Sequence, residues 1–316
     1  MPFYLIGRVI RNECFLRTWY NMKEKNKNFP ERNPLPNMNI LLSFLHILLV
    51  SLIELLYLFG ILVAVGFILG VFERYASTFL VRTFGPRAVL VTAWIGTPIH
   101  EIGHLIQCFI WGHRVTRVKL LQVNSPTGVL GYVEHSYNRN SMFQKVGNFF
   151  IGMGPIFSGI GALVLGMYLL VPKSYIVFKA YIHQHVSLEI LDVNVVKMAG
   201  GAVLALTKGL FTVENLINPL FWLFLVLAIS ISSHIALSKA DIQGSARGLL
   251  MIFFVLVLFN IVSGVLQWDS YQMIVKLAEY NAYILAFSSI ALFFSLINLA
   301  LSFLFYLMKK YINPRI

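Results

Sequence analysis

One short segment of the sequence holds two histidines and a glutamate at a spacing that suits metal chemistry. His100-Glu101-Ile102-Gly103-His104 matches the pattern H-E-x-x-H. On a helix, residues four apart lie on the same face, so both imidazoles can reach a single ion and Glu101 can reach a water bound to it. Zinc suits such a site because it takes three protein ligands and keeps one position for water. We therefore predict that His100 and His104 are zinc ligands and that Glu101 is the base.

The composition indicates that this motif lies in a membrane. The chain has 316 residues, of which 58% are apolar and 12% charged, against roughly 25% charged residues in soluble domains. This excludes an ordinary soluble globular protein. The formal net charge is +12, but the basic residues lie between long apolar runs and form no single basic face, so no nucleic-acid partner is expected. The expected partner is the lipid bilayer.

Six apolar runs are long enough to cross the hydrocarbon layer, for which about 20 helical residues are needed. They cover about 39–70, 88–112, 147–171, 217–238, 247–267 and 281–308. We expect an all-α polytopic membrane protein with about six transmembrane helices, the second of which contains the H-E-x-x-H motif. A polar N-terminal leader, 1–38, precedes a multi-pass membrane domain, 39–312.

The basic residues between the runs indicate the orientation of the chain. If the leader is cytoplasmic and all six runs cross, about two thirds of the 25 Lys and Arg residues face the cytoplasm, as the positive-inside rule requires. Both termini of this integral membrane protein are then cytoplasmic. The second run travels inward, so His100 and His104 lie in its cytoplasmic half.

The third metal ligand must come from elsewhere in the chain, and we favour Asp241. This residue follows the fourth apolar run, which also ends on the cytoplasmic side. A helix N-cap is the alternative role for Asp241. His234 lies two turns earlier on a similar face if the helix is continuous, so it is a second candidate ligand. It is also a candidate for supporting the ligands or polarising the substrate.

At these residues the chain resembles the site-2 protease family of intramembrane zinc metalloproteases. The shared features are the H-E-x-x-H motif in a membrane helix, Gly-Met-Gly-Pro at 152–155, and Asp241 followed by Gly244. The second is similar to an Ala-Gly-Pro segment of the family and the third to its Asp-Gly-containing helix. The alternating residues of 115–133 look like the membrane-associated strands that follow the first ligand helix in that family. The resemblance implies a metalloprotease-like core over about 88–250.

The resemblance implies a zinc metalloendopeptidase that hydrolyses a peptide bond in or near a transmembrane segment of a membrane-protein substrate. Zinc lowers the pKa of its water toward about 7. Glu101 accepts the proton of this water and later delivers it to the leaving amine.

The chain departs from the family pattern near the ligands. The family usually has Asn and two prolines just before its ligand Asp, and this chain lacks them. Ser158 stands where an Asn often follows the Gly-Pro pair. The residue that polarises the substrate carbonyl is therefore left open, with Ser158 and His234 as candidates.

Two other functions fit parts of the sequence. A thermolysin-type membrane zinc protease would use Glu134 as its third ligand and would act on soluble peptides. A non-catalytic transporter or assembly factor would use the same His and Glu side chains to gate ions. No inverted repeat is visible between the two halves of the chain, which argues against a transporter.

Overall fold

The chain folds mainly into helices. The computed structural model describes residues 36–123, 128–185 and 193–312, except 267, 269 and 279. The chain divides into two units, 1–49 and 50–316, and the contacts below belong to the second. The predicted leader, 1–38, lies almost wholly outside the described residues, as do the predicted cytoplasmic ends.

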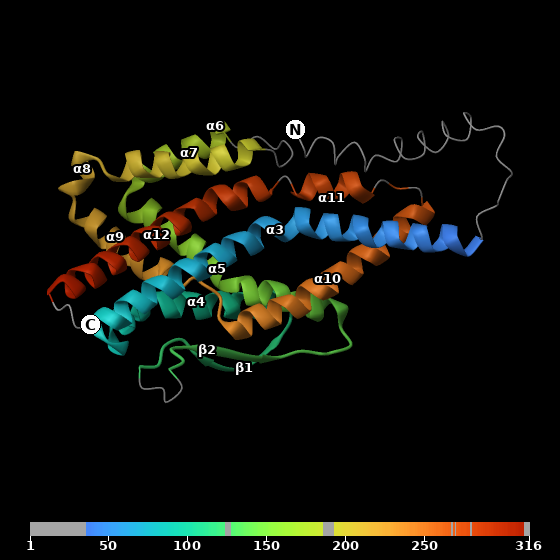
Figure 1. The fold of residues 1–316 in the computed structure, drawn as a ribbon, viewed down its shortest axis with the longest axis horizontal. Helices are drawn as coiled ribbons and strands as arrows, with labels where there is room; N and C mark the ends of the chain where they lie inside the picture. Colours follow the sequence, from blue (N-terminus) through green and yellow to red (C-terminus); the bar gives the residue numbers. More distant parts are fainter. Residues whose placement is uncertain are drawn as a thin grey trace. The chain divides into compact units, whose positions relative to one another are not determined.

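The elements (Figure 1) are α3 Pro36–Phe84, η1 Pro86–Val89, α4 Leu90–Ile110, β1 Arg114–Lys119, β2 Tyr132–Ser136, α5 Met142–Leu170, α6 Pro172–His185, α7 Val193–Leu210, α8 Val213–Leu216, α9 Pro219–Ser232, α10 Lys239–Leu266, α11 Ser270–Ala278 and α12 Asn281–Ile312.

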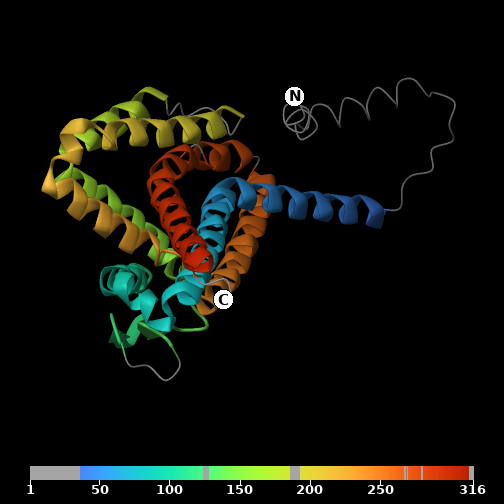
Figure 2. The same ribbon diagram turned by 60° about the vertical axis from the view of Figure 1, so that its left-hand side comes forward.

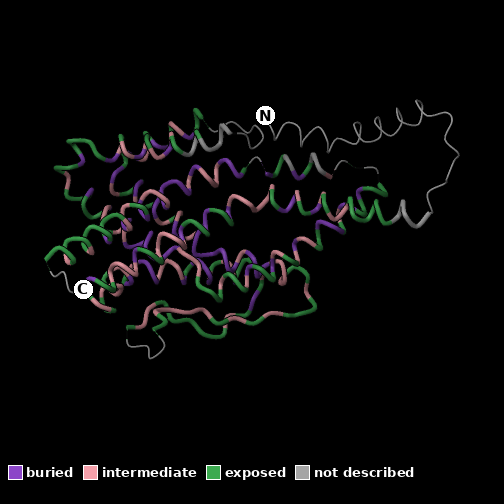
Figure 3. Tube along the Cα trace, in the orientation of Figure 1, coloured by how far each residue is buried: buried purple, intermediate pink, exposed green. Residues whose placement is uncertain are grey.

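Among the described residues, four helical stretches are long and apolar enough to cross a membrane. They are Leu41–Phe84, Met142–Leu170, Lys239–Leu266 and Lys276–Ile312. Many large apolar side chains on these and neighbouring helices are exposed, such as Phe67, Val91 and Val265, and Figure 3 shows exposed positions along the helices. Extended apolar surface is unfavourable in water but suits contact with lipid tails. These features indicate a membrane protein.

The predicted count of six crossings is not confirmed. α4 has 21 residues, but its polar H-E-x-x-H motif lowers its hydropathy, and it is not among the four stretches. α9 has 14 residues, which span about 21 Å at 1.5 Å per residue, less than the roughly 30 Å of the hydrocarbon layer. Whether α4 and α9 cross, and which way the chain is oriented, remain predictions.

The predicted strand region after α4 is confirmed as a two-stranded antiparallel sheet. Arg114 lies opposite Ser136 and Lys119 opposite Tyr132, with an irregularity between Val115 and Arg117. Both strands contact α4, and Figures 1 and 2 show the hairpin beside that helix. The two strands are shorter in total than the expected range of 115–133 but extend slightly beyond both of its ends, and part of their connection lies outside the described residues. The hairpin brings the start of β2 close to the H-E-x-x-H motif.

α5 makes its most extensive helix contacts with α4 and α10, and glycines permit the close approach on both sides. A Cβ atom at Gly154 would lie only 2.6 Å from the carbonyl oxygen of Gly103 in α4. A Cβ atom at Gly152 would lie 2.5 Å from the carbonyl oxygen of Asp241 in α10. Small residues commonly allow membrane helices to pack at such short range. The Gly-Met-Gly-Pro segment therefore lies between the two helices that hold the predicted ligands.

This packing makes Gly154 sensitive to substitution. We expect Gly154→Ala to lower the free energy of unfolding by about 1–3 kcal/mol, because the new methyl group overlaps the backbone of α4. Gly161→Ala is the matched control in the same helix, since a Cβ atom there meets nothing within 4 Å. It should leave stability unchanged or raise it by up to about 1 kcal/mol. Unfolding in detergent micelles measures both variants, and equal effects would contradict this account of the helix contact.

Candidate metal centre

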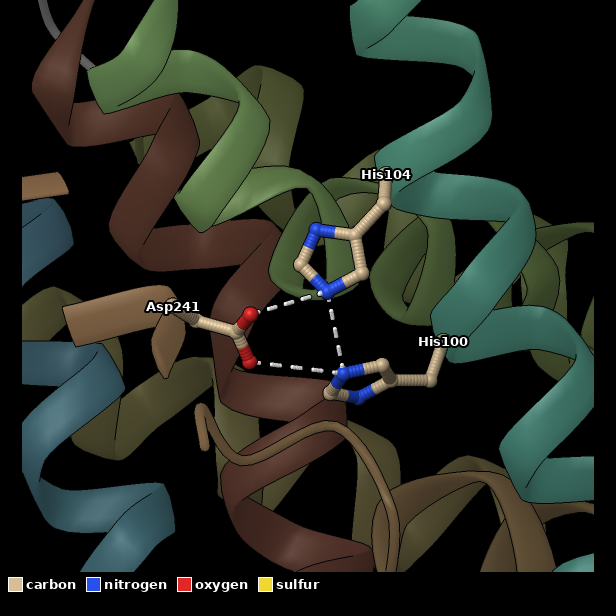
Figure 4. A group of neighbouring side chains, drawn as sticks. All are labelled: His100, His104 and Asp241. Atoms are coloured by element: carbon tan, nitrogen blue, oxygen red, sulfur yellow. Dashed lines mark hydrogen bonds and ion pairs between the residues drawn. The ribbon is translucent and has the colours of Figure 1, made fainter. Parts of the chain in front are cut away.

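The structure brings together His100, His104 and Asp241, the three residues that we predicted as metal ligands (Figure 4). The Nε2 atoms of His100 and His104 lie 3.2 Å apart. The carboxylate of Asp241 approaches from another helix, with Oδ1 at 3.2 Å from His104 Nε2 and Oδ2 at 3.6 Å from His100 Nε2. One ligand atom from each residue lies within 4.8 Å of the others. Such a group could hold a metal ion, and two imidazoles with one carboxylate form a known zinc ligand set.

Backbone carbonyl groups orient both imidazole rings. His100 Nδ1 lies 2.7 Å from the carbonyl oxygen of His234, and His104 Nδ1 lies 2.7 Å from the carbonyl oxygen of Ile151. A carbonyl oxygen only accepts hydrogen bonds, so each Nδ1 carries the proton and donates it. In the neutral ring the lone pair then lies on Nε2, the atom that faces the other histidine and the carboxylate of Asp241. This is the tautomer that metal binding through Nε2 requires.

Asp241 belongs to the three-residue group and also takes part in capping α10, although Ser238 and not Asp241 occupies the N-cap position. His234 and Asp241 would share a helix face only in a continuous helix, and this condition is not met, because 233–238 is not helical and Asp241 lies in the first turn of α10. The N–H of Ser238 donates to Asp241 Oδ2 at 2.7 Å, and the N–H of Asp241 donates to Ser238 Oγ at 3.2 Å. These reciprocal bonds form a capping box. They hold the carboxylate at the helix start, facing the histidines.

His234 and Ser158, the two candidate supporting residues, lie close to the ligand helix. The Nε2 atom of His234 lies 3.0 Å from Thr92 Oγ1, and this buried ring is not part of the three-residue group. His234 instead contacts His100 through its backbone carbonyl oxygen. Ser158 Oγ donates to the carbonyl oxygen of Ile99 at 2.8 Å, which links α5 to the residue before His100. Substrate polarisation by either residue remains a prediction.

Glu134, the ligand of the thermolysin-type alternative, lies apart from the three-residue group. It is in β2, where its side chain is 53% exposed and its Oε2 atom lies 3.8 Å from Arg117 Nε. A solvated, paired carboxylate of this kind needs no metal. The geometry therefore favours Asp241 as the third ligand.

Glu101, the predicted base, is 6% exposed. It lies against Gly131, the residue before β2. A Cβ atom at Gly131 would lie 2.8 Å from Glu101 Cγ and 2.9 Å from Thr97 Cγ2. Only a residue without a side chain lets the backbone come this close to the carboxyl group. Sequence reasoning missed this contact, although an isolated glycine inside a strand pattern, as Gly131 is within 115–133, often marks close backbone approach.

A second pair of histidines links β2 to the segment that follows α4. His113 lies in that segment and His135 lies in β2. His113 Nε2 donates to the carbonyl oxygen of Gln144 at 2.8 Å, so His113 Nδ1 accepts from His135 Nδ1 at 2.9 Å. The ring of Tyr137 stacks on His113. Burial lowers the pKa of His113, and burial together with the neighbouring histidines lowers the pKa of His135 to about 4. Both rings are therefore neutral near pH 7, as an N–H···N bond requires.

The fold and the site define a helical membrane protein with a candidate metal centre on α4 and α10. Comparisons with family models, curated proteins and solved structures find no match for this chain. The resemblance to site-2 proteases therefore rests on the motifs and their order.

Proposed function

We propose that this protein is an intramembrane zinc metalloprotease that cleaves a membrane-protein substrate in or near its transmembrane segment. The observation that supports this most strongly is the assembly of His100, His104 and Asp241 beside Glu101. The two histidines come from a helix with the H-E-x-x-H motif, and the aspartate lies in the first turn of a helix long and apolar enough to cross a membrane. This ligand set, with a glutamate adjacent to the first histidine, is suited to metal-assisted hydrolysis.

Different residues have different roles in the proposed reaction. Zinc held by the two histidines and Asp241 would supply a Lewis acid that activates water and polarises the peptide carbonyl. Glu101 accepts a proton from the attacking water and donates it to the nitrogen of the leaving amine. The carbonyl oxygens of His234 and Ile151 keep both imidazole rings in the tautomer that binds metal.

The substrate must present an unwound backbone to this site. A helical segment has its carbonyl groups in internal hydrogen bonds, and in lipid there is no water to replace these bonds. Gly, Pro, Asn and Ser weaken the helix and favour local unwinding. We therefore propose that the substrate contains such residues at the cleavage site.

The expected orientation predicts where cutting occurs. If the second run travels inward, the metal lies between the bilayer centre and the cytoplasmic face, and water enters from that side. We expect the protein, reconstituted in vesicles, to cut single-span substrates in the cytoplasmic half of the span. Mass spectrometry of the products from substrates with Gly or Pro at different depths measures this. Cuts outside the span, or in its far half, would contradict the proposed orientation or mechanism.

A further inference from the structure

The carbonyl oxygen that orients His104 lacks its usual helical partner because of a proline. In an α-helix the carbonyl of residue i accepts the N–H of residue i+4, so the partner of Ile151 would be residue 155. That residue is Pro155, inside α5, and proline has no N–H. The carbonyl oxygen of Ile151 instead accepts the Nδ1–H of His104 at 2.7 Å.

The surrounding contacts keep this carbonyl and this imidazole together. Ile151 and His104 are 3% and 7% exposed, so water has little access to either group. A buried carbonyl without a donor is unfavourable, and the ring N–H removes that penalty. Gly154, next to the proline, packs against Gly103, the residue before His104. The two helices are therefore in close contact beside the point where the ring meets the carbonyl.

His100 is oriented in a related way. Its Nδ1 atom donates to the carbonyl oxygen of His234, which lies in the non-helical segment 233–238 between α9 and α10. Both predicted histidine ligands thus donate to a carbonyl oxygen that accepts no helical N–H. The carbonyl of His234, which pairs with His100, lies beyond the end of α9. The carbonyl of Ile151, which pairs with His104, lacks a helical donor because of Pro155.

We propose that Pro155 is a positioning residue of the metal centre. By leaving the carbonyl oxygen of Ile151 without a helical donor, it reserves that oxygen for His104 and so directs the Nε2 lone pair of His104 at the metal. The inference rests on the metal site of the proposed function and does not depend on the reaction.

Pro155→Ala tests this inference, because alanine restores an N–H that competes for the carbonyl oxygen of Ile151. The full-length variant should bind zinc about ten- to a hundredfold more weakly, the usual cost of losing a partner behind a metal ligand. Competition with a fluorescent chelator measures the affinity. The thermal midpoint of the metal-free variant should stay about the same, because the helical bond gained and the removal of a proline from a helix interior offset the loss of the hydrogen bond from the ring N–H of His104. Affinity and stability should therefore not fall together.

Pro172→Ala is the matched control. Pro172 is the first residue of α6, where the N–H has no partner within the helix, so this change should leave zinc affinity unaltered. Unchanged zinc affinity in Pro155→Ala would overturn the inference. A lower thermal midpoint of metal-free Pro155→Ala would also overturn it, because the proline would then act through packing. Wild-type protein that takes up no zinc would contradict the metal site itself. Zinc uptake with the expected Pro155→Ala result but without proteolysis would contradict the proposed function alone.

Discussion

Glu101→Gln is expected to keep the bound zinc and lose turnover. Glutamine has nearly the same shape as glutamate, but its amide cannot accept a proton from water. General acid–base catalysis contributes about 10²- to 10⁴-fold to rate, so we expect cleavage to fall by roughly 1000-fold. Zinc content should stay at the wild-type value, because Glu101 is not among the three residues that form the metal group. Metal analysis of the purified protein and the rate of substrate cleavage measure the two effects.

Glu134→Gln is the control for this prediction. It makes the same chemical change at an exposed glutamate of β2 that pairs with Arg117, and it should alter neither zinc content nor cleavage. Normal cleavage by Glu101→Gln would show that another residue is the base. Loss of zinc in Glu134→Gln would favour the thermolysin-type ligand set instead.

Asp241→Asn is expected to remove zinc. The amide oxygen of asparagine can still accept the N–H of Ser238 and so preserve much of the helix cap, but an uncharged amide is a poor zinc ligand. Loss of a residue that hydrogen-bonds to a metal ligand lowers metal affinity by about 10- to 100-fold. Loss of a ligand itself should lower the zinc affinity by more than this. Equilibrium dialysis against zinc buffers measures it.

Ser238→Ala separates ligation from capping. It removes the hydroxyl that accepts the N–H of Asp241, at an expected cost of about 1 kcal/mol in stability, while the carboxylate remains. Zinc affinity should stay close to that of the wild type. If Asp241→Asn binds zinc as tightly as the wild type, the third ligand is another residue.

The local features of the protein could be predicted from the sequence. Apolar runs determine which segments become long apolar helices, because every backbone polar group in lipid must be satisfied within a helix. The i, i+4 spacing places His100 and His104 on one face of α4 through helical geometry alone. Alternation of side chains after α4 likewise predicted the strands, although the limits of β1 and β2 differ from the expected range.

The contacts between distant residues were decided only by the tertiary structure. Asp241 was a candidate ligand beside Glu134 and His234, and only the packing of α4, α5 and α10 brings its carboxylate to the histidines. We treated a helix cap and a metal ligand as alternative roles of Asp241, whereas the break before α10 lets its carboxylate accept the N–H of Ser238 and still face both histidines. Periodicity describes one helix at a time, so it cannot show which carbonyl of α5 meets His104 or which glycine lies against Glu101. Those pairings depend on how closely the helices and the hairpin approach, which the glycines at these contacts permit.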